Sequence, residues 1–566
     1  MRSSACREKS RPVTECSSGT DRPKTYRIRT KFYLSGATDY DDEDRSWDLD
    51  VEAKGDPFWT ICCPGPPSLS QETGKLHNRS VSRPEIPLKN LPGHHTKIVC
   101  TIGPASDSPP ILREMIKNGM NVARLNLAHG SPEEHRARIE RIREASRTTG
   151  RRVLILADLP GPKIRLGTLA APITLRRGER LLLSPQGQLK EKGELVAIPL
   201  DLPPLLRPLR RGDRIILSDG TLSLRVEDPK DDALLCRVVT GGVLVSHKGV
   251  NLPGLMTLEG AFTASDRSLL SFVLDAGVEA VSVSFVTSAD DVEAVRQESR
   301  RQGHDPFIVA KIERRQALKN IDAILDRADG IMVARGDLGV EVPLERIALY
   351  QKELIRKAVE AGKPVITATQ MLESMVHNPK PTRAEVTDVS NAIIDGTDAI
   401  MLSEESAIGD HPVAAVAMLS RIARVTESQP TAGHTVLDDP PRTSFPVEEV
   451  VAYGVRTAVK TLKPVLVVTP TESGRTASRI ARFRLSPWIL ALCPQEQVCQ
   501  RLCLTRGVWP VKVEGEGGSW EKTARNILRE EGIIKGLIVL TRGPGPQSPG
   551  ESNQLEIIRL EIPESG

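Results

Sequence analysis

Short apolar runs alternate along most of this chain with segments whose apolar residues recur at helical spacing. Residues 97–101, 120–127 and 153–157 are expected to form strands. The segment between the first two ends at Gly119, a typical helix stop. The segment after the second begins at Ser131 with the pattern of a capping box. This order predicts parallel strands connected by helices.

The alternation stops after Gly167. Residues 168–249 contain short strands separated by turn signals such as Gly241-Gly242, without helical periodicity, which predicts a small all-β insertion. We expect this insertion to fold as a β-barrel lid. Strand-helix alternation then resumes. The further expected strands are residues 280–285, 307–310, 330–334, 364–368 and 399–402. Eight strands in about 250 residues, without the insertion, are typical of a (β/α)₈ TIM barrel.

A third folded unit follows the barrel. Its expected strands are residues 465–469, 489–492, 508–513 and 537–540. Helices between them indicate an α/β layer domain. The predicted fold class is therefore α/β, with a barrel, an inserted lid and a C-terminal domain. We expect these boundaries: barrel 95–167 and 250–435, lid 168–249, C-terminal α/β domain 436–566.

The first 94 residues have a different composition. They mix Ser, Pro, Gly and charges, with an acidic run at residues 39–44 and no sustained periodicity. Such a sequence is typical of a disordered extension. A regulatory tail, or sequence translated from upstream of the true start, are the alternatives.

Composition narrows the class of protein only modestly. A length of 566 residues suits about three domains. With 39% hydrophobic and 27% charged residues and a net charge of +4, the chain is expected to be soluble, and nothing favours nucleic acid as a partner. No apolar run approaches the roughly 20 residues of a membrane span, and the start lacks a secretory apolar segment. We expect a cytoplasmic protein without a membrane partner.

Nine cysteines without paired spacing fit reduced thiols. Cys493, Cys499 and Cys503 could be read as metal ligands. Because Val498, Cys499, Leu502 and Cys503 fall on one face of an expected helix, packing is the favoured interpretation.

Charged residues follow two of the expected barrel strands directly. Lys311 and Glu313 follow one, and Arg335, Gly336 and Asp337 follow the next. Charge at the end of an apolar strand costs several kcal/mol unless it is paired. The carboxyl ends of barrel strands are where such enzymes place catalytic residues. Other polar residues at these ends are Arg124, Asn126, Asp158, Ser284, Thr369, Gln370, Glu404 and Glu405.

These residue types suit a metal-bound phosphate and an oxyanion. Lys311 and Glu313 are two positions apart on a strand, so both point into the barrel mouth. Glu313 and Asp337 can hold a hard cation such as Mg²⁺, which takes one or two carboxylates plus substrate oxygens. Arg124 offers a fork for phosphate or carboxylate. The amides of Gly336 and Asp337, at a helix start, can bind a carboxylate. A ring of salt bridges closing the barrel is the structural alternative, and it would not require this mixture.

Five long segments resemble the motifs of pyruvate kinases, in the family's order. They are residues 96–106, 248–254, 330–339, 367–375 and 381–386. The resemblance covers nearly everything from Thr96 to the last expected strand, and the family has the same three-part layout. It implies phosphoryl transfer from phosphoenolpyruvate to ADP, giving pyruvate and ATP, with Mg²⁺ or Mn²⁺ as cofactor. A homotetramer is also implied.

The resemblance assigns roles to the strand-end residues. Arg124 and Lys311 would hold the transferring phosphoryl group, with Mg²⁺ on Glu313 and Asp337. The amides of Gly336 and Asp337 would hold the substrate carboxylate, and Thr369 would belong to the relay that protonates the enolate. The positions that match nucleotide contacts are Asn126, His129, Arg165 and Lys248. The lid would close over them and exclude water.

One departure concerns the monovalent cation. Many members bind K⁺ through Asn, Ser, Asp and Thr oxygens. Asn126 and Asp158 remain here, whereas Ala128 and Leu159 replace the other two, and Lys163 stands where Glu is usual. Members with this pattern do not require K⁺, so we expect the Lys163 ammonium to supply the missing charge. The alternative is a surface lysine beside a degraded site.

The C-terminal domain carries a candidate anion site. Hydroxyls and backbone amides follow an expected strand and open a helix, at Thr471, Ser473, Gly474, Arg475 and Thr476. This loop resembles the family's effector loop for sugar phosphates or nucleotides, so we expect a phosphorylated allosteric effector. An ordinary helix-capping loop is the alternative.

Two other functions remain open from the sequence. A Mg²⁺-dependent lyase or aldolase acting on pyruvate enolates would need neither a nucleotide lid nor Lys248. A catalytically dead metabolite-binding relative would be expected to have lost Lys311, Glu313 or Asp337, and all three are present.

Overall fold

The structure is a computed structural model that describes residues 26–30, 47–51, 91–162, 164–185, 195–200, 209–230, 233–253, 260–429, 446–513, 520–533, 535–543 and 553–561. It divides into two compact units, Met1–Arg83 and Pro84–Gly566. In the first unit, strand β1 (Tyr26–Thr30) pairs antiparallel with β2 (Trp47–Val51). The remainder of the expected extension up to residue 90, with its acidic run, lies outside the described residues.

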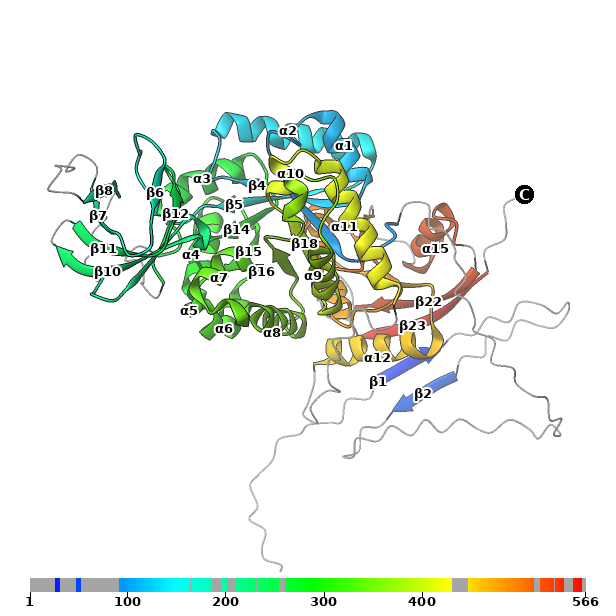
Figure 1. Cartoon of the computed structure of the whole chain (residues 1–566). Helices are drawn as coiled ribbons and strands as arrows, with labels where there is room; N and C mark the ends of the chain where they lie inside the picture. The colour runs from blue at the N-terminus through cyan, green and yellow to red at the C-terminus, as the bar shows by residue number, and fades with distance from the viewer. Residues whose placement is uncertain are drawn as a thin grey trace, which may run out of the picture. The chain divides into compact units, whose positions relative to one another are not determined.

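The larger unit contains a closed parallel barrel, which confirms the predicted fold class. Its eight strands are β3 (Lys97–Thr101), β4 (Met120–Asn126), β5 (Leu154–Leu159), β14 (Ala280–Val283), β15 (Phe307–Ile312), β16 (Gly330–Ala334), β17 (Val365–Ala368) and β18 (Ala399–Leu402). In Figure 1 these strands lie inside a layer of helices. The helices are α1 (Pro109–Lys117), α2 (Pro132–Thr149), α3 (Ala264–Asp275), α4 (Ala289–Arg301), α5 (Arg315–Lys319), α6 (Ile321–Arg327), α7 (Arg335–Glu341), α8 (Ile347–Glu360), α9 (Arg383–Ile394), α10 (Glu404–Ala407) and α11 (Pro412–Glu427), with 3₁₀ turns η3 (Leu344–Arg346) and η4 (Glu373–Val376).

Local sequence fixes where the helices begin. At α2 the Ser131 hydroxyl accepts the Glu134 amide hydrogen, and the Glu134 carboxylate accepts the Ser131 amide hydrogen, so the predicted capping box is present. Gly150 ends this helix in the left-handed conformation, with φ 65°. Thr263 and Thr382 cap α3 and α9 in the same way.

Alternation along the barrel strands separates two apolar layers. Outward residues such as Ile308 and Ile331 pack against the helices. Inward residues such as Val309 and Met332 fill the barrel. Because side chains on one face recur every second residue, Val309 is followed inside the barrel by Lys311. The inner layers therefore change from apolar to charged at the carboxyl ends of the strands.

The inserted segment is all β, as predicted, and has its own core. A six-stranded sheet is formed by β7 (Arg180–Ser184), β8 (Val196–Pro199), β9 (Arg214–Leu217), β10 (Leu222–Lys230), β11 (Ala233–Thr240) and β13 (Val250–Asn251). Beside it β6 (Ile173–Leu175) pairs with β12 (Gly242–Leu244), and the turn η2 spans Ser218–Gly220. Leucines such as Leu183 and Leu224 form a cluster distinct from the barrel core.

The C-terminal domain is a five-stranded sheet with helices. Its strands, in spatial order, are β21 (Val508–Lys512), β20 (Trp488–Cys493), β19 (Leu466–Pro470), β22 (Lys535–Arg542) and β23 (Gln554–Glu561). Its helices are α12 (Val447–Leu462), α13 (Arg475–Ala481), α14 (Glu496–Leu502) and α15 (Trp520–Glu530). The sequence reading missed β23, which runs antiparallel to β22. Its alternation, with Ile558 and Leu560 buried, was the available signal.

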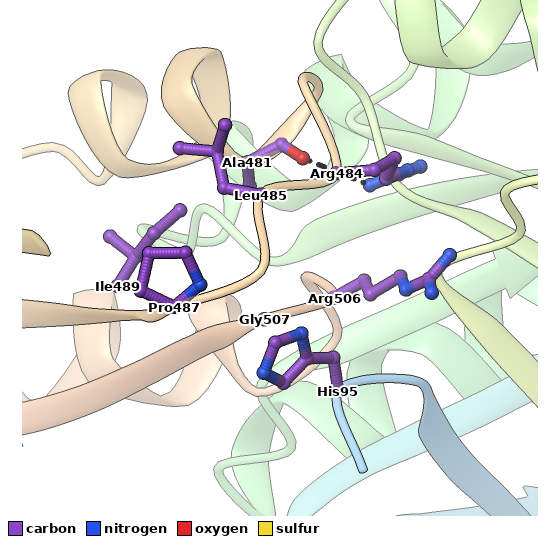
Figure 2. A pocket seen from close by; sticks show the side chains of 8 residues that line it. All are labelled: His95, Ala481, Arg484, Leu485, Pro487, Ile489, Arg506 and Gly507. Atoms are coloured by element: carbon purple, nitrogen blue, oxygen red, sulfur yellow. Dashed lines mark hydrogen bonds between the residues drawn. The ribbon is translucent and has the colours of Figure 1, made fainter. Parts of the chain in front are cut away.

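Buried ion pairs join this domain to the floor of the barrel. Arg484 binds both carboxylate oxygens of Asp398, at 2.9 and 2.7 Å, and both side chains are 2% exposed. Arg506 lies 3.3 Å from Glu427. Figure 2 shows the small cavity at this junction, where Arg484 and Arg506 lie across from His95. Its volume of about 10 Å³ is room for one water molecule.

The cysteine and membrane predictions can also be compared with the fold. Cys493, Cys499 and Cys503 are buried free thiols, and Cys499 packs in an apolar cluster with Val498 and Leu502, which favours the packing interpretation. Within the described ranges, no group of three or more His, Cys, Asp or Glu side chains is arranged to hold a metal. None of the helices in those ranges is long and apolar enough to cross a membrane.

Candidate active site

A buried carboxylate lies between two cations at the mouth of the barrel. Asp158, at the end of β5, accepts hydrogen bonds from Arg124 Nε at 3.0 Å and Nη2 at 2.5 Å, while Lys311 Nζ lies 3.4 Å from the same oxygen. Ser282 Oγ donates to the other carboxylate oxygen at 2.7 Å. Burial disfavours the charged form, but Lys311 and Arg124 outweigh it and hold the pKa of Asp158 below its ordinary value. The group is therefore ionised and serves to orient both cations.

Lys311 joins this carboxylate to a second one. Its ammonium lies 2.8 Å from Glu313 Oε1 and donates to Ser284 Oγ, also at 2.8 Å. Burial alone would lower the pKa of Lys311, but Asp158 and Glu313 raise it well above its ordinary value. Lys311 therefore stays positively charged throughout the physiological pH range.

Glu313 carries negative charge that the site only partly compensates. Its side chain is 1% exposed, and its Oε2 accepts the Phe285 amide hydrogen at 2.8 Å. Burial raises the pKa of Glu313, Lys311 opposes this, and the neighbouring Asp337 raises it further. Asp337 thus adds to the negative charge around Glu313, while Glu313 shares the Lys311 ammonium with Asp158, so the site favours the binding of another cation.

The strand order explains why these side chains meet. β4, β5, β14 and β15 are consecutive in the barrel, so their carboxyl ends form one arc of the rim. The backbone contributes as well, because Phe285 adopts a left-handed conformation (φ 58°) that directs its amide to Glu313. Sequence reasoning missed Phe285, since a backbone donor in an unusual conformation leaves no pattern in residue types.

Gly336 and Asp337 lie in the first turn of α7, next to the loop that carries Thr369. The Gly336 amide donates to Thr369 Oγ1 at 2.8 Å, and that hydroxyl donates to the Ala368 carbonyl at 2.6 Å. Thr369 and Gln370 both have positive φ angles, 68° and 55°. The structure thus brings together two residues predicted for substrate binding. It also places a hydroxyl on the amide predicted to hold the substrate carboxylate.

Arg335, between strand β16 and these amides, had no predicted role. Its guanidinium turns onto the backbone of the Thr369 loop, where Nη2 donates to the Thr369 carbonyl at 2.6 Å. An arginine in an Arg-Gly-Asp segment could as well face the substrate, so residue type alone did not indicate this direction.

The residues predicted to contact nucleotide lie at the barrel rim and at the lid junction. Asn126 Oδ1 accepts the Ala128 amide hydrogen at 3.3 Å, and His129 is exposed beside it. Arg165 Nη1 donates to the His247 carbonyl at 3.2 Å. Lys248 is exposed and its carbonyl accepts the Leu166 amide hydrogen.

The two glutamates after β18 differ in environment. Glu404 is exposed, consistent with a rim charge. Glu405 is 2% exposed and accepts the amide hydrogens of Leu372 at 3.1 Å and Ser403 at 2.7 Å, and burial raises its pKa. Glu405 therefore supports the loops around the site.

The expected monovalent-cation residues are only partly described. Lys163 lies outside the described residues. Leu159 is 1% exposed and Ala128 half-buried, and neither side chain carries an oxygen. Both oxygens of Asp158 already have partners in Arg124, Lys311 and Ser282.

The candidate effector loop links β19 to α13. Thr471 Oγ1 accepts the Gly474 amide hydrogen at 2.9 Å. Gly474 has a φ of 81°, a conformation that is unfavourable for residues with a side chain. Arg475 Nε donates to Ser473 Oγ at 3.4 Å, and both residues are exposed, whereas Thr471 and Thr476 are buried. The loop is therefore closed by its own hydroxyls.

Cations and carboxylates buried at the carboxyl ends of barrel strands define a TIM-barrel enzyme. Comparison with known proteins narrows the class. Residues 93–416 match the profile of the pyruvate kinase barrel domain, and residues 449–558 that of the pyruvate kinase alpha/beta domain. The pyruvate kinase of Thermococcus litoralis is 43% identical over 478 residues, which cover 83% of this chain and 99% of that protein.

Two further relatives give the same answer. The pyruvate kinase of Geobacillus stearothermophilus is 41% identical over 472 residues, covering 82% of this chain and 80% of the relative. The pyruvate kinase of Mycobacterium tuberculosis is 38% identical over 471 residues, covering 82% and 98%. The chain belongs to the pyruvate kinase family, and the predicted family and enzyme class are confirmed.

Proposed function

We propose that the chain transfers the phosphoryl group of phosphoenolpyruvate to ADP in a Mg²⁺-dependent reaction, giving pyruvate and ATP, as the last step of glycolysis. The observation that carries this proposal is the Arg124–Asp158–Lys311–Glu313 cluster beside Asp337. It offers cations for a phosphoryl group and carboxylates for a metal at one side of the barrel mouth.

Arg124 and Lys311 would neutralise the transferring group. Asp158 holds the Arg124 guanidinium from one side while Thr101 Oγ1 accepts from Nη1 at 2.9 Å, so the fork is fixed before substrate arrives. Phosphoryl transfer depends mainly on positioning and charge neutralisation, and a fixed cation incurs no reorganisation cost. As the phosphoryl group leaves, the Lys311 ammonium would also stabilise the enolate.

Glu313 and Asp337 fit a hard divalent cation, Mg²⁺ or Mn²⁺. Both offer oxygen, and the raised pKa of Glu313, caused by burial and in part by Asp337, reflects negative charge that a cation would relieve. Such an ion, when bound, would supply Lewis-acid stabilisation of phosphoryl and enolate oxygens. Phe285 holds Glu313 in place through its amide.

The substrate carboxylate would be bound, and the enolate would be protonated, beside α7. The amides of Gly336 and Asp337 would receive the carboxylate at the helix start. Thr369 Oγ1, now hydrogen-bonded to the Gly336 amide and the Ala368 carbonyl, would belong to the relay that protonates the enolate carbon. Nucleotide would be bound by Asn126, His129, Arg165 and Lys248, with the lid excluding water so that ADP, and not water, receives the phosphoryl group.

A coupled assay tests the reaction. Phosphoenolpyruvate, ADP and Mg²⁺ are supplied, and lactate dehydrogenase reports pyruvate as NADH is consumed. We expect pyruvate formation that requires both ADP and Mg²⁺. Pyruvate release without ADP from candidate aldol substrates would favour a lyase instead, and failure to form pyruvate under any of these conditions would contradict catalysis.

We further propose that the enzyme does not require K⁺. Asp158, which would contribute an oxygen to such a site, already has Arg124 and Lys311 as cationic partners. Lys163 would add the remaining charge.

The exposed loop at Ser473 and Arg475 is proposed to bind a phosphorylated effector. Candidate sugar phosphates and nucleotides are titrated against the wild type and Arg475→Ala, and equal responses would refute the assignment.

A homotetramer and a cytoplasmic location complete the proposal. Leu344 of η3 and Leu349 of α8 are 76% and 65% exposed, and a second copy would cover such apolar side chains. Analytical ultracentrifugation is expected to give the mass of four chains.

A further inference from the structure

The loop after β17 is held in an unfavourable backbone conformation. Thr369 and Gln370 are consecutive residues with φ angles of 68° and 55°. The left-handed region disfavours side chains, and a β-branched residue such as Thr is a genuine outlier there. Such a conformation persists only when surrounding contacts enforce it. Since Thr369 supplies a hydroxyl to the candidate site, those contacts determine where this hydroxyl lies.

One guanidinium contacts three successive carbonyls of this loop. Arg335 Nε donates to the Ala368 carbonyl at 3.3 Å, and Nη2 donates to the carbonyls of Thr369 at 2.6 Å and Gln370 at 3.3 Å. The same nitrogen lies 2.9 Å from the sulfur of Met371. The side chain of Arg335 is 9% exposed, and its bonds to Ala368, Thr369 and Met371 are partly buried, whereas its bond to Gln370 lies at the surface. Together they span every backbone carbonyl from the strand end to the second left-handed residue.

Residues of two other helices orient the guanidinium. Its Nη1 pairs with Asp388 of α9 at 2.6 Å and donates to Gln351 Oε1 of α8 at 3.3 Å. One nitrogen of the guanidinium thus binds side chains of α8 and α9, while its other two nitrogens bind the loop. Arg335 itself begins α7, one residue before the Gly336 amide that contacts Thr369.

We propose that Arg335 is a positioning residue that fixes Thr369 for proton delivery by holding the Thr369–Gln370 turn in its left-handed conformation. The proposal rests on the proposed reaction, in which Thr369 belongs to the proton relay. Arg335 touches neither reacting atom; it acts through the loop backbone.

The contact between Thr369 and Gly336 does not replace this role. In the proposed reaction the substrate carboxylate takes the Gly336 amide hydrogen, so the hydroxyl loses that partner when the site fills. The bonds from Arg335 to the carbonyls do not involve the hydroxyl and persist. Only the guanidinium then holds the turn from the side of α7.

The geometry requires arginine specifically. A planar guanidinium presents donors in a rigid fork, whereas a lysine ammonium is a single point on a flexible chain. Arg335→Lys keeps the positive charge opposite Asp388 but cannot span three carbonyls. This substitution therefore tests whether the several donors of the guanidinium, and not only its positive charge, are needed to hold the loop.

The test compares Arg335→Lys with Arg296→Lys. Arg296 is 13% exposed and pairs with Asp329 at 2.9 Å, beside the start of strand β15 at the opposite end of the barrel. Two measurements are made on the full-length chain. Amide hydrogen exchange, read by mass spectrometry, reports the order of residues 368–376 without reference to activity. Steady-state kinetics and the exchange of pyruvate methyl protons with deuterated solvent, followed by NMR, report catalysis and the proton step.

We expect Arg335→Lys to accelerate exchange across residues 368–376, whereas Arg296→Lys leaves that segment unchanged. The kcat and the methyl-proton exchange rate are expected to fall roughly 10- to 100-fold, the scale of a misplaced catalytic group, with the KM for ADP unchanged. In a Thr369→Ala background, Arg335→Lys is expected to slow the proton step by less than twofold, because both changes remove the same function.

Each contrary result has a distinct meaning. If amide exchange were unchanged in Arg335→Lys, Arg335 would not hold the Thr369–Gln370 turn, whatever the activity of the variant. Faster amide exchange with unaltered kcat, or a full additional loss in the Thr369→Ala background, would overturn the positioning role. A wild-type chain without phosphotransfer from phosphoenolpyruvate would refute the proposed function and this role in it, while amide exchange would still report whether Arg335 holds the loop.

Discussion

Replacing Lys311 with Met tests the charge arrangement of the site most directly. The ammonium contacts Glu313 at 2.8 Å and Asp158 at 3.4 Å, and these carboxylates are 1% and 3% exposed. Asp158 keeps Arg124 in the variant, but Glu313 loses its cation and keeps Asp337 as a neighbour. Breaking a buried pair by removing one partner costs about 3–5 kcal/mol. Loss of one fixed charge stabiliser costs a further 10²–10³-fold or so in kcat.

The stability loss should depend on pH with a defined sign. Burial and Asp337 already raise the pKa of Glu313 while Lys311 lowers it, so removing Lys311 raises it further. A carboxyl with a folded-state pKa above its unfolded value contributes stability at low pH, which is lost as the pH rises through the folded-state pKa. The free-energy difference between wild type and Lys311→Met is therefore expected to be larger at pH 8 than at pH 5.

Urea denaturation at both pH values, followed by circular dichroism, measures this difference, and the coupled assay measures kcat. Lys352→Met is the matched control, because Lys352 pairs with Asp395 but is 57% exposed. The control is expected to lose less than about 1 kcal/mol and no activity. The reasoning would be refuted if Lys311→Met were as stable as wild type at pH 8. It would also be refuted if the difference in free energy of unfolding between the two proteins became smaller from pH 5 to pH 8.

Three further results are expected. Burial lowers the pKa of Lys97 to about 8, against the opposing effects of Cys503, Glu427 and Asp398, so the contribution of Lys97 to stability should increase by about 3 kcal/mol as the pH passes from 8 to above 10.5. In denaturation curves, the stability of wild type relative to Lys97→Met should therefore rise by that amount over this pH range. Asp398→Ala leaves the buried Arg484 without its partner and should cost about 3–5 kcal/mol by calorimetry, and a loss below about 1 kcal/mol would contradict a structural role for the pair. Activity in choline chloride should match activity in KCl at equal ionic strength within about twofold. A steep dependence of activity on K⁺ concentration would contradict the proposed role of Lys163.

The sequence was informative about the site wherever side-chain periodicity sets direction. Val309, Lys311 and Glu313 are spaced by two along β15, so the charged pair must continue the inner face of the strand that Val309 begins. Barrel closure then brings Asp158 and Arg124 to the same rim, because β4 and β5 lie close to β15 in the strand order. Residue type, spacing and strand order were sufficient for this part.

The sequence was uninformative where tertiary contacts impose the backbone conformation. Phe285 and Thr369 both have positive φ angles although their residue types disfavour them. Their conformations follow from Glu313, which accepts the Phe285 amide hydrogen, and from Arg335, which binds the Thr369 carbonyl. Neither contact has a local sequence pattern, since the partners are 28 and 34 residues away. Strand β23 differs from these two residues, because its alternating pattern, with Ile558 and Leu560 buried, is visible in the local sequence.

The contact between Gly336 and Thr369 links substrate binding to the proton step. In this structure the amide hydrogen predicted for the substrate carboxylate is already bound to Thr369 Oγ1, which in turn donates to Ala368. A carboxylate, being charged, is the stronger acceptor for that amide at a helix start. Its binding in the proposed reaction would therefore free a lone pair on Thr369 Oγ1, which can accept a proton from water while the hydroxyl turns from the Ala368 carbonyl and gives its own proton to the enolate carbon. The proton relay would then be completed by the substrate itself, at a hydroxyl whose position Arg335 maintains.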